Sequence, residues 1–337
     1  MRYSFRAYGL TLNSDTPLPS LREETNLLDS PDIEMSFGPE PPWVRGVRHL
    51  PFRVAWPVSG VAEEDESQFT LTSFGVGDYF ELAYGDRARF LMDGSAKRLW
   101  GTYLPPLTLE DLATYLLGPV MGFVLRRRGT LALHGSSVSI SGHAVILCGP
   151  SESGKSTIAA ALALRGFPVL TEDISPVLES RGSSFVEPGY PRVCLWPETV
   201  SSLLGAPDTL PRLTPTWEKC FLPLDGKRAK FEPNKLVLGT VYVLGQRVNE
   251  ADAPRIENLA MRGALVELVQ NTYMNWLLDR DQRADELSLL TSLVARVPVK
   301  RVVPHEDPRR LAALCDLIIK DAQSLQGRRA FAAIGRG

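Results

Sequence analysis

The stretch that decides the fold is Gly149-Pro150-Ser151-Glu152-Ser153-Gly154-Lys155-Ser156, in a chain of 337 residues. It satisfies the pattern G-x-x-x-x-G-K-[ST] of a phosphate-binding P-loop. Glycine lets such a loop turn its backbone amides inward without a side-chain clash, and amides that precede a helix form an anion site. The spacing predicts that these residues, with Thr157, cradle the phosphates of a nucleoside triphosphate.

The residues on either side of the loop make the pattern specific. An apolar strand is expected over 144–148, and a helix rich in Ala and Leu over 157–164. Lys155 can reach the outer phosphates, and the Ser156 hydroxyl can ligate Mg²⁺. A strand, a glycine-rich loop and a helix in this order predict an α/β domain that binds phosphates.

Glu172 and Asp173 follow the next expected strand, 167–171. If this strand, the helix before it and the strand before the P-loop form one βαβ unit, the two strands are parallel. Both then end at the edge of the sheet where ligands bind in open α/β folds. We expect one carboxylate to hold Mg²⁺, directly or through water, and the other to accept a proton from an attacking hydroxyl. An acidic turn without function is the alternative.

A hairpin brings His134 to the same point. Ser141-Gly142 is a turn signal between expected strands over 130–140 and 144–148. In a two-residue hairpin, residues equally far from the turn face each other, so His134 lies opposite Gly149. There it could contact the outer phosphate or help position the nucleophile. A lone structural histidine is the alternative.

The regions before the P-loop domain have different patterns. Residues 1–105 predict a smaller β-rich domain, in which the acidic run 63–66 is expected to be a solvated turn. Residues 106–128 predict a connecting helix with Thr108 as its N-cap. Pro119 is placed to kink or divide that helix.

The P-loop domain is expected over 129–326. It includes a buried strand at 236–244 and helices around 265–278 and 308–323. Residues 327–337 are expected to be a flexible tail.

Composition and charge exclude several classes of protein. The formal net charge of −2 makes no global electrostatic case for nucleic-acid binding. The four cysteines are far apart and form no CxxC pair, so neither a zinc site nor a disulfide framework is indicated. No run approaches the ~18 apolar residues that span a bilayer, and the first residues lack a secretory apolar run. We therefore expect a cytoplasmic protein without nucleic-acid or membrane partners.

Four features in order resemble the catalytic domain of HPr kinase/phosphorylase. They are Leu133-His134-Gly135, the P-loop, Leu164-Arg165-Gly166-Phe167-Pro168 and Glu172-Asp173. The resemblance covers roughly residues 129–245 and implies a mixed sheet with helices, ATP and Mg²⁺. Carried over, His134 matches the family's active-site histidine, and the two acids match its catalytic base and magnesium-linked acid. Because the family's first acid is usually Asp, we favour Asp173 as the base, and we also name it with Ser156 as a metal ligand.

The chain also departs from that family. The Gly-rich signature with Arg-Gly is replaced by a different stretch over 187–197, and residues 1–105 look different as well. These departures point away from HPr as the acceptor. The chain is more similar to the HPr-kinase-related proteins of ribosomal peptide biosynthesis, including lasso peptide kinases, which phosphorylate a serine at the C-terminal end of a precursor peptide.

Four basic residues are further candidates for contacts with substrate or phosphate: Arg192, Lys219, Lys227 and Arg228. Phosphoryl transfer profits from cations near developing charge, and an arginine can bind a peptide carboxylate bidentately. Lysines and arginines are usually surface residues, so that alternative stays open.

Together these observations predict an ATP-dependent serine kinase. It would transfer the terminal phosphoryl group to a serine of a peptide or small protein, with the C-terminal serine of a lasso peptide precursor as the favoured acceptor. Lys155 and Mg²⁺ would stabilise the transferred charge, and the β-rich domain would help select the substrate. A P-loop ATPase, an HPr-type protein serine kinase and a non-catalytic nucleotide-binding regulator remain as alternatives, and a homo-oligomer stays open.

Overall fold

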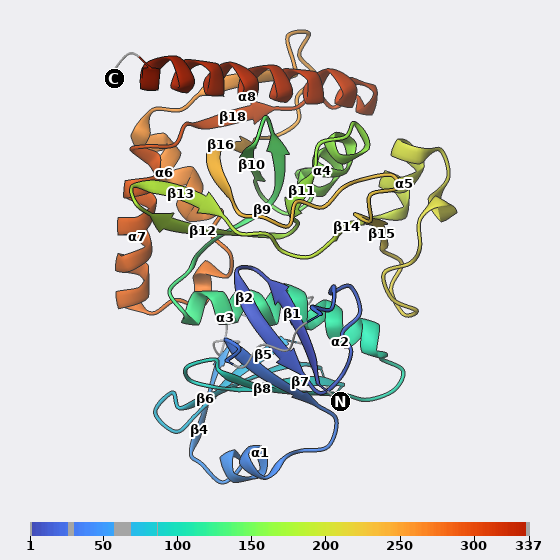
Figure 1. Ribbon diagram of the computed structural model, residues 1–337, viewed down its shortest axis with the longest axis vertical. Coiled ribbons are helices and arrows are strands. Elements are labelled where there is room, and N and C mark those ends of the chain that lie inside the picture. Colours follow the sequence, from blue (N-terminus) through green and yellow to red (C-terminus); the bar gives the residue numbers. More distant parts are fainter. Residues whose placement is uncertain (1, 26–29, 57–68, 86, 335–337) are drawn as a thin grey trace. The chain divides into compact units, whose positions relative to one another are not determined.

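The computed structural model describes residues 2–25, 30–56, 69–85 and 87–334, and the chain forms two compact units (Figure 1). The first unit comprises Met1–Arg128 together with Arg212–Glu218, and the second comprises Gly129–Pro211 with Lys219–Gly337. The chain therefore leaves the second unit after Pro211 and re-enters it at Lys219. The acidic run 63–66 lies outside the described residues.

The first unit is built on an eight-stranded sheet, as expected for the β-rich N-terminal region. Its strands are β1 (Tyr3–Ala7), β2 (Leu10–Ser14), β3 (Ile33–Phe37), β4 (Phe52–Trp56), β5 (Phe69–Phe74), β6 (Tyr79–Tyr84), β7 (Ala88–Asp93) and β8 (Arg98–Tyr103), with one short helix, α1 (Pro42–Val47). The strand order is β1-β2-β3-β8-β7-β6-β5-β4. β3 pairs in parallel with both β2 and β8, and the other pairs are antiparallel.

The expected helix over 106–128 is divided into three parts, α2 (Leu109–Tyr115), a π-helical turn η1 (Leu116–Val120) and α3 (Met121–Arg127). Thr108 is confirmed as the N-cap, because it forms a capping box with Asp111. The division lies where Pro119 was expected to kink the helix, and Gly118 before it has non-helical angles of φ −91° and ψ −105°. The Tyr8 hydroxyl donates to the Leu117 carbonyl at 2.7 Å, which ties this helical segment to the start of the chain.

The second unit is a mixed sheet with helices, and it confirms the predicted α/β class. Its main strands are β9 (Leu131–Ile140), β10 (His143–Cys148), β11 (Val169–Thr171), β12 (Ile174–Ser180), β13 (Ser183–Val186), β16 (Leu236–Leu244), β17 (Arg255–Asn258) and β18 (Val299–Val303). The order is β10-β9-β12-β13-β16-β18-β17, and β11 pairs with β9. β10 also pairs with β16, which closes the first five strands of this order into a ring.

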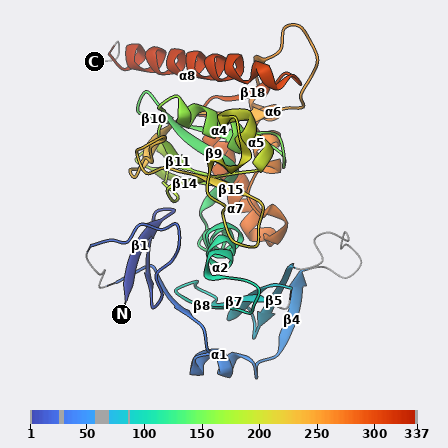
Figure 2. The same cartoon turned by 90° about the vertical axis from the view of Figure 1, so that its right-hand side faces the viewer.

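Helices cover both faces of this sheet. They are α4 (Lys155–Leu164), α5 (Pro197–Leu204), α6 (Met261–Gln270), α7 (Arg280–Val294) and α8 (Leu311–Ile334). Val145 and Leu147 of β10 share a core with α4 and α8, whereas Ile146 shares a core with α6 and α7. Alternate residues of a strand point to opposite faces, so two separate cores form. Figures 1 and 2 both show α8 beside β18, and α4 next to α5.

A two-stranded ribbon packs against α4. It consists of β14 (Arg192–Leu195) and β15 (Cys220–Pro223), and Val193 and Leu222 join the core that includes α4. Three 3₁₀ turns complete the unit, η2 (Pro207–Thr209), η3 (Asn275–Leu277) and η4 (Pro308–Arg310).

The helices near the C-terminus have other bounds than expected. The helix expected over 265–278 starts earlier and ends at Gln270, because the side chains of Asn271 and Thr272 bond to the carbonyls of Glu267 and Val269 and close the last turn. α8 extends to Ile334, into the stretch 327–337 for which a flexible tail was predicted. No proline follows Gly327 to stop the helix, and residues 335–337 lie outside the described residues.

Candidate functional site

The hairpin before the P-loop has the predicted register. Ser141 (φ 50°) and Gly142 (φ 77°) occupy the left-handed region, as a two-residue type I′ turn requires. β9 and β10 pair from His143 opposite Ile140 to Cys148 opposite Gly135. One step further, this register sets His134 against the start of the P-loop at Gly149.

The P-loop leads from β10 into α4. Gly149 (φ 150°) and Gly154 (φ 102°) adopt angles that favour glycine, and Gly154 is the N-cap of α4. Lys155 is the first residue of that helix, and its Nζ donates to the carbonyls of Gly149 at 2.9 Å and Pro150 at 2.8 Å. Burial lowers the pKa of Lys155, and the charges of the nearby acids oppose that effect.

Glu172 and Asp173 form a two-residue bend between β11 and β12. Both strands run antiparallel to β9, so β11 is parallel to β10 with β9 between them. Asp173 has a φ of 68°, and its carbonyl accepts the Gly135 N–H at 3.0 Å. A side chain other than glycine rarely adopts this angle, and such backbone is typical of functional sites. This bend interrupts the strand, and both acids line the same cavity as the P-loop.

The carboxylate of Glu172 is hydrogen-bonded to the serine of the P-loop. Ser156 Oγ donates to Glu172 Oε1 at 2.8 Å. Glu172 is buried, and this burial together with the charge of Asp173 raises its pKa, although the hydrogen bond from Ser156 acts in the opposite direction.

The carboxylate of Asp173 has different partners. His134 Nε2 lies 3.2 Å from Asp173 Oδ1, and the Tyr273 hydroxyl donates to Asp173 Oδ2 at 3.3 Å. Burial acts to raise the pKa of Asp173, but the hydrogen bond and charge of His134 and the charges of Lys219 and Lys155 outweigh it, so the pKa is lowered. Asp173 is therefore ionised at neutral pH, the state in which a carboxylate can accept a proton.

These groups line one cavity of about 550 Å³. Its walls include the P-loop from Ser151 to Thr157 except Ser153, together with His134, Glu172, Asp173 and Lys219. Residues that the sequence analysis did not single out complete the wall: Cys194, Leu195, Trp196, Glu198, Thr199 and Arg247. The Lys219 ammonium stands over the Trp196 ring, 4.8 Å from its centroid. The cavity thus combines an amide-lined anion site, two carboxylates and cations.

The other basic candidates lie outside this wall. Arg192 is buried, and its guanidinium stands over the Tyr190 ring at 4.9 Å, from where its charge opposes the rise in the pKa of Glu172. Lys227 and Arg228 are exposed, and Lys227 Nζ lies 3.6 Å from Asp225 Oδ2. Among the described residues that line the cavity, neither Lys227 nor Arg228 occurs. Contacts of these two residues with a substrate stay a prediction.

Arg247 and Tyr273 are the most informative residues that sequence reasoning missed. Arg247 follows β16, and its Nη2 donates to the Glu152 carbonyl at 3.4 Å, over the P-loop. Tyr273 follows α6 and reaches Asp173 because its own N–H donates to the Ala132 carbonyl of β9. Both come from segments about 100 residues beyond the P-loop, and no local motif marks them.

The oxygen ligands fit a magnesium ion that arrives with a nucleotide. No three His, Cys, Asp or Glu side chains gather as a metal site in the part of the chain that the structure describes. Mg²⁺ usually takes one or two protein oxygens, with phosphate oxygens and water completing its shell. Ser156 Oγ and the Glu172 carboxylate, 2.8 Å apart, are such a pair of hard oxygens.

Comparisons with known proteins add the following findings. No protein-family model matches the chain, and no curated protein matches it. Among solved structures, the Hpr(Ser) kinase/phosphatase from Coxiella burnetii is similar to part of the chain. The match has 10% sequence identity and a TM-score of 0.33, and it covers 58% of this chain and 98% of that one. None of the helices that the structure describes combines the length and the hydropathy of a bilayer-spanning segment.

Proposed function

We propose that this protein is a P-loop phosphotransferase that moves the terminal phosphoryl group of ATP to a serine hydroxyl of a peptide or small protein. One observation carries the proposal. Two adjacent carboxylates line the P-loop cavity with separate partners, Glu172 with Ser156 and Asp173 with His134. A site that only holds a nucleotide needs a cradle and a metal ligand, whereas phosphoryl transfer to a hydroxyl also needs a proton acceptor.

The division of partners supports different roles for the two acids. Glu172 and Ser156 would hold Mg²⁺, which when bound neutralises charge on the phosphates. The sequence pattern predicts Asp173 and Ser156 as the metal ligands, but Ser156 donates to Glu172, so we propose Glu172 as the metal ligand beside Ser156. Asp173 then serves as the base, held in place by His134 and Tyr273.

The proposed step is a direct, in-line transfer. The serine oxygen forms a bond to the terminal phosphorus while the bond from that phosphorus to the bridging oxygen breaks, and ADP leaves. The serine proton passes to the Asp173 carboxylate. Lys155 and Lys219 supply positive charge beside the transferred group. The backbone of the P-loop orients the phosphates, so most of the catalysis is positioning and electrostatics.

The acceptor that we propose is the C-terminal serine of a lasso peptide precursor. This choice rests on the resemblance of the site residues to ribosomal-peptide kinases and on the departures from the HPr kinase signature over 187–197. We also propose that the protein acts in the cytoplasm, where ATP and Mg²⁺ are available, and that the β-rich unit helps select the peptide.

The proposal is tested with labelled ATP, Mg²⁺ and a precursor peptide that ends in serine. We expect phosphate on that serine, and none on a matched peptide that ends in alanine. Asp173→Asn should lower kcat by about 10²-fold or more, because a general base contributes about 10²–10⁴ in rate, while the Kd for ATP changes little. Asp225→Asn, an acid outside the cavity, should leave kcat unchanged.

Three outcomes would reject parts of the proposal. Absence of phosphopeptide despite ATP binding rejects the peptide acceptor, and transfer to HPr in its place would favour an HPr-type kinase. Rapid ATP hydrolysis at a rate that does not depend on any phosphoryl acceptor would favour an ATPase. If Asp173→Asn keeps most of the activity, the base is assigned wrongly.

A further inference from the structure

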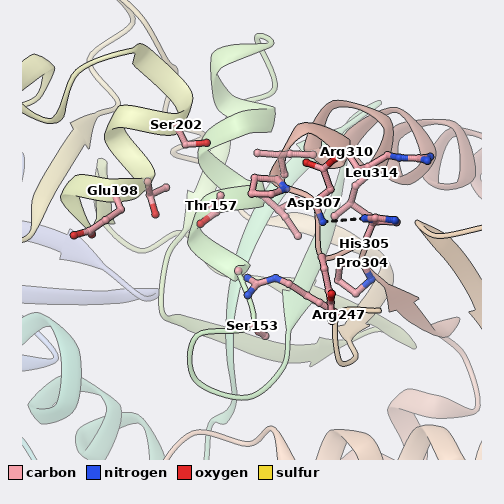
Figure 3. Close-up of a pocket in the computed structure, with 16 residues that line it drawn as sticks. Ser153, Thr157, Glu198, Ser202, Arg247, Pro304, His305, Asp307, Arg310 and Leu314 are labelled. Carbon is pink, nitrogen blue, oxygen red and sulfur yellow. Dashed lines mark hydrogen bonds between the residues drawn. The ribbon is translucent and has the colours of Figure 1, made fainter. Parts of the chain in front are cut away.

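A second cavity lies beside the end of the P-loop and the start of α4 (Figure 3). Its volume is about 410 Å³, within the range of sites that hold small ligands. It is bounded by the end of the P-loop and α4, by α5, by the loop after β18 and by the start of α8. None of the chemistry proposed above uses it.

The two cavities adjoin each other and share part of their walls. They share five residues, Gly154, Thr157, Glu198, Thr199 and Arg247. Among the described residues, the second cavity is not lined by Lys155, Ser156, Glu172 or Asp173. It therefore continues from the phosphate cavity on the side away from the catalytic acids.

The direction of a bound triphosphate follows from the P-loop itself. The lysine of such a loop reaches the β- and γ-phosphates, and the loop amides cradle the α- and β-phosphates. Lys155 and the acids therefore mark the γ end. The α-phosphate, and the nucleoside attached to it, must then leave the loop toward Gly154 and Thr157, where the second cavity opens.

Arg247 stands at the junction of the two cavities. Its Nη2 is 3.4 Å from the Glu152 carbonyl, and a Cβ built on Gly154 would lie 3.2 Å from the same nitrogen. Within the described part of the chain, its guanidinium forms no ion pair. A guanidinium that lies over an anion loop without a carboxylate partner is placed to bind phosphate oxygens.

The lining of the second cavity suits a nucleoside. Ile158, Leu311 and Leu314 provide apolar contact for a flat base. The lining also includes the polar side chains of Glu198, Ser202 and Asp307 (Figure 3), which are suited to hydroxyl and amino groups. An apolar site with a few convergent polar groups is what a base with an attached ribose requires.

His305 also lines the cavity. Its Nδ1 accepts the Asp307 N–H at 2.9 Å (Figure 3), which holds the ring against the loop after β18.

We propose that this second cavity binds the base and ribose of the nucleotide, with Arg247 on the phosphates between the two cavities. The inference rests on the proposed binding of a triphosphate in the P-loop, and it adds that the donor is recognised as a nucleoside triphosphate and not as a polyphosphate chain alone.

The test compares the Kd of Mg²⁺-ATP with that of Mg²⁺-tripolyphosphate, measured by calorimetry on the full chain. Two variants fill the cavity from opposite walls, Ser202→Trp on α5 and Glu306→Trp in the loop after β18; both native side chains are exposed. We expect each variant to weaken ATP binding by about tenfold or more and to leave tripolyphosphate binding within about twofold. Ser324→Trp, at an exposed serine of α8 outside the cavity, is the matched control and should change the Kd of neither ligand.

The outcomes separate this inference from the proposed function. If the unmodified protein binds ATP and tripolyphosphate equally, or if both cavity variants leave ATP binding intact, the second cavity does not hold the nucleoside, although phosphate binding in the P-loop stands. Equal weakening of both ligands by both variants also overturns the inference. Failure to bind either ligand overturns the P-loop proposal as well, whereas selective ATP binding without phosphoryl transfer supports the cavity and rejects the kinase.

Discussion

Glu172 and Asp173 are consecutive residues whose side chains have different partners. The pKa of Glu172 is raised by burial and by the charge of Asp173, and the positive charge of Lys219 acts to lower it. Glu172 must be ionised to hold a metal ion, so its protonation should set the acid limit of activity. Asp173, with a lowered pKa, stays ionised throughout that range.

The pH dependence of kcat/KM for ATP tests this difference, because kcat/KM reports the pKa values of the free enzyme. We expect kcat/KM to fall toward acid with a midpoint above 4.5, the ordinary pKa of a glutamate. Lys219→Met removes a charge that lowers the pKa of Glu172, so the midpoint should move to higher pH. Lys227→Met, an exposed lysine outside the cavity, should not move it. A midpoint that stays in place or moves to lower pH in Lys219→Met contradicts the assignment.

At the scale of elements, the start of α2 shows how side chains close a helix end. Thr108 and Asp111 bond to each other's backbone N–H in a capping box, and the carboxylate of Asp111 also accepts the Thr216 hydroxyl. Burial would raise the pKa of Asp111, but the hydrogen bonds from Thr216 and Thr108 outweigh it, so the pKa lies below 3.8. The carboxylate therefore stabilises the folded state more strongly than its protonated form does.

Asp111→Asn should lower the free energy of unfolding by about 2 kcal/mol at pH 7, the usual contribution of hydrogen bonds to a charged group. Because the folded-state pKa is depressed, this contribution is complete above 3.8 and is lost as the pH falls toward the folded value. In urea unfolding, the difference in the free energy of unfolding between the variant and the unmodified protein should be constant down to about pH 4 and should shrink below it. Glu110→Gln, in the same helical turn, serves as the control. If the loss in the free energy of unfolding caused by Asp111→Asn grew toward acid pH, the lowered pKa of Asp111 would be contradicted.

At the scale of the whole molecule, the chain crosses between its units three times, after Arg128, Pro211 and Glu218. The segment Arg212–Glu218 belongs to the first unit, where the Trp217 ring meets the Tyr115 ring at 5.6 Å. A segment of seven residues is thus ordered by contacts more than 100 residues away in the sequence, between Thr216 and Asp111.

Thr216→Val keeps the shape of the side chain and removes this hydrogen bond. We expect a loss of about 1–3 kcal/mol in the free energy of unfolding, since the charged acceptor is left with one partner fewer. Tryptophan fluorescence follows the first unit well, because Trp43, Trp56, Trp100 and Trp217 belong to it, out of six tryptophans in the chain. Combined with Asp111→Asn, the two losses should be less than additive; full additivity would show that the pair does not interact. Thr209→Val, which removes a local bond to the Ala206 carbonyl, is the control.

Local patterns in the sequence determined the P-loop, the register of the hairpin before it, the Thr108 cap and the strand Leu236–Leu244. Each of these depends on dihedral preferences and hydrogen bonds within a few residues, or on an unbroken apolar run, and such terms are present in the sequence itself.

Only the tertiary structure decided which acid meets Ser156, that Arg247 and Tyr273 reach the site, and that a second cavity opens beside α4. The bend at Asp173 (φ 68°) sets the direction of both carboxylates, and its carbonyl is held by the N–H of Gly135 in β9, which is distant in the sequence. Contacts between residues about 100 positions apart require the closure of a long loop, which lowers the conformational entropy of the chain. The burial of many side chains throughout the fold offsets this loss. No short stretch of sequence contains all the interactions that together stabilise such a contact.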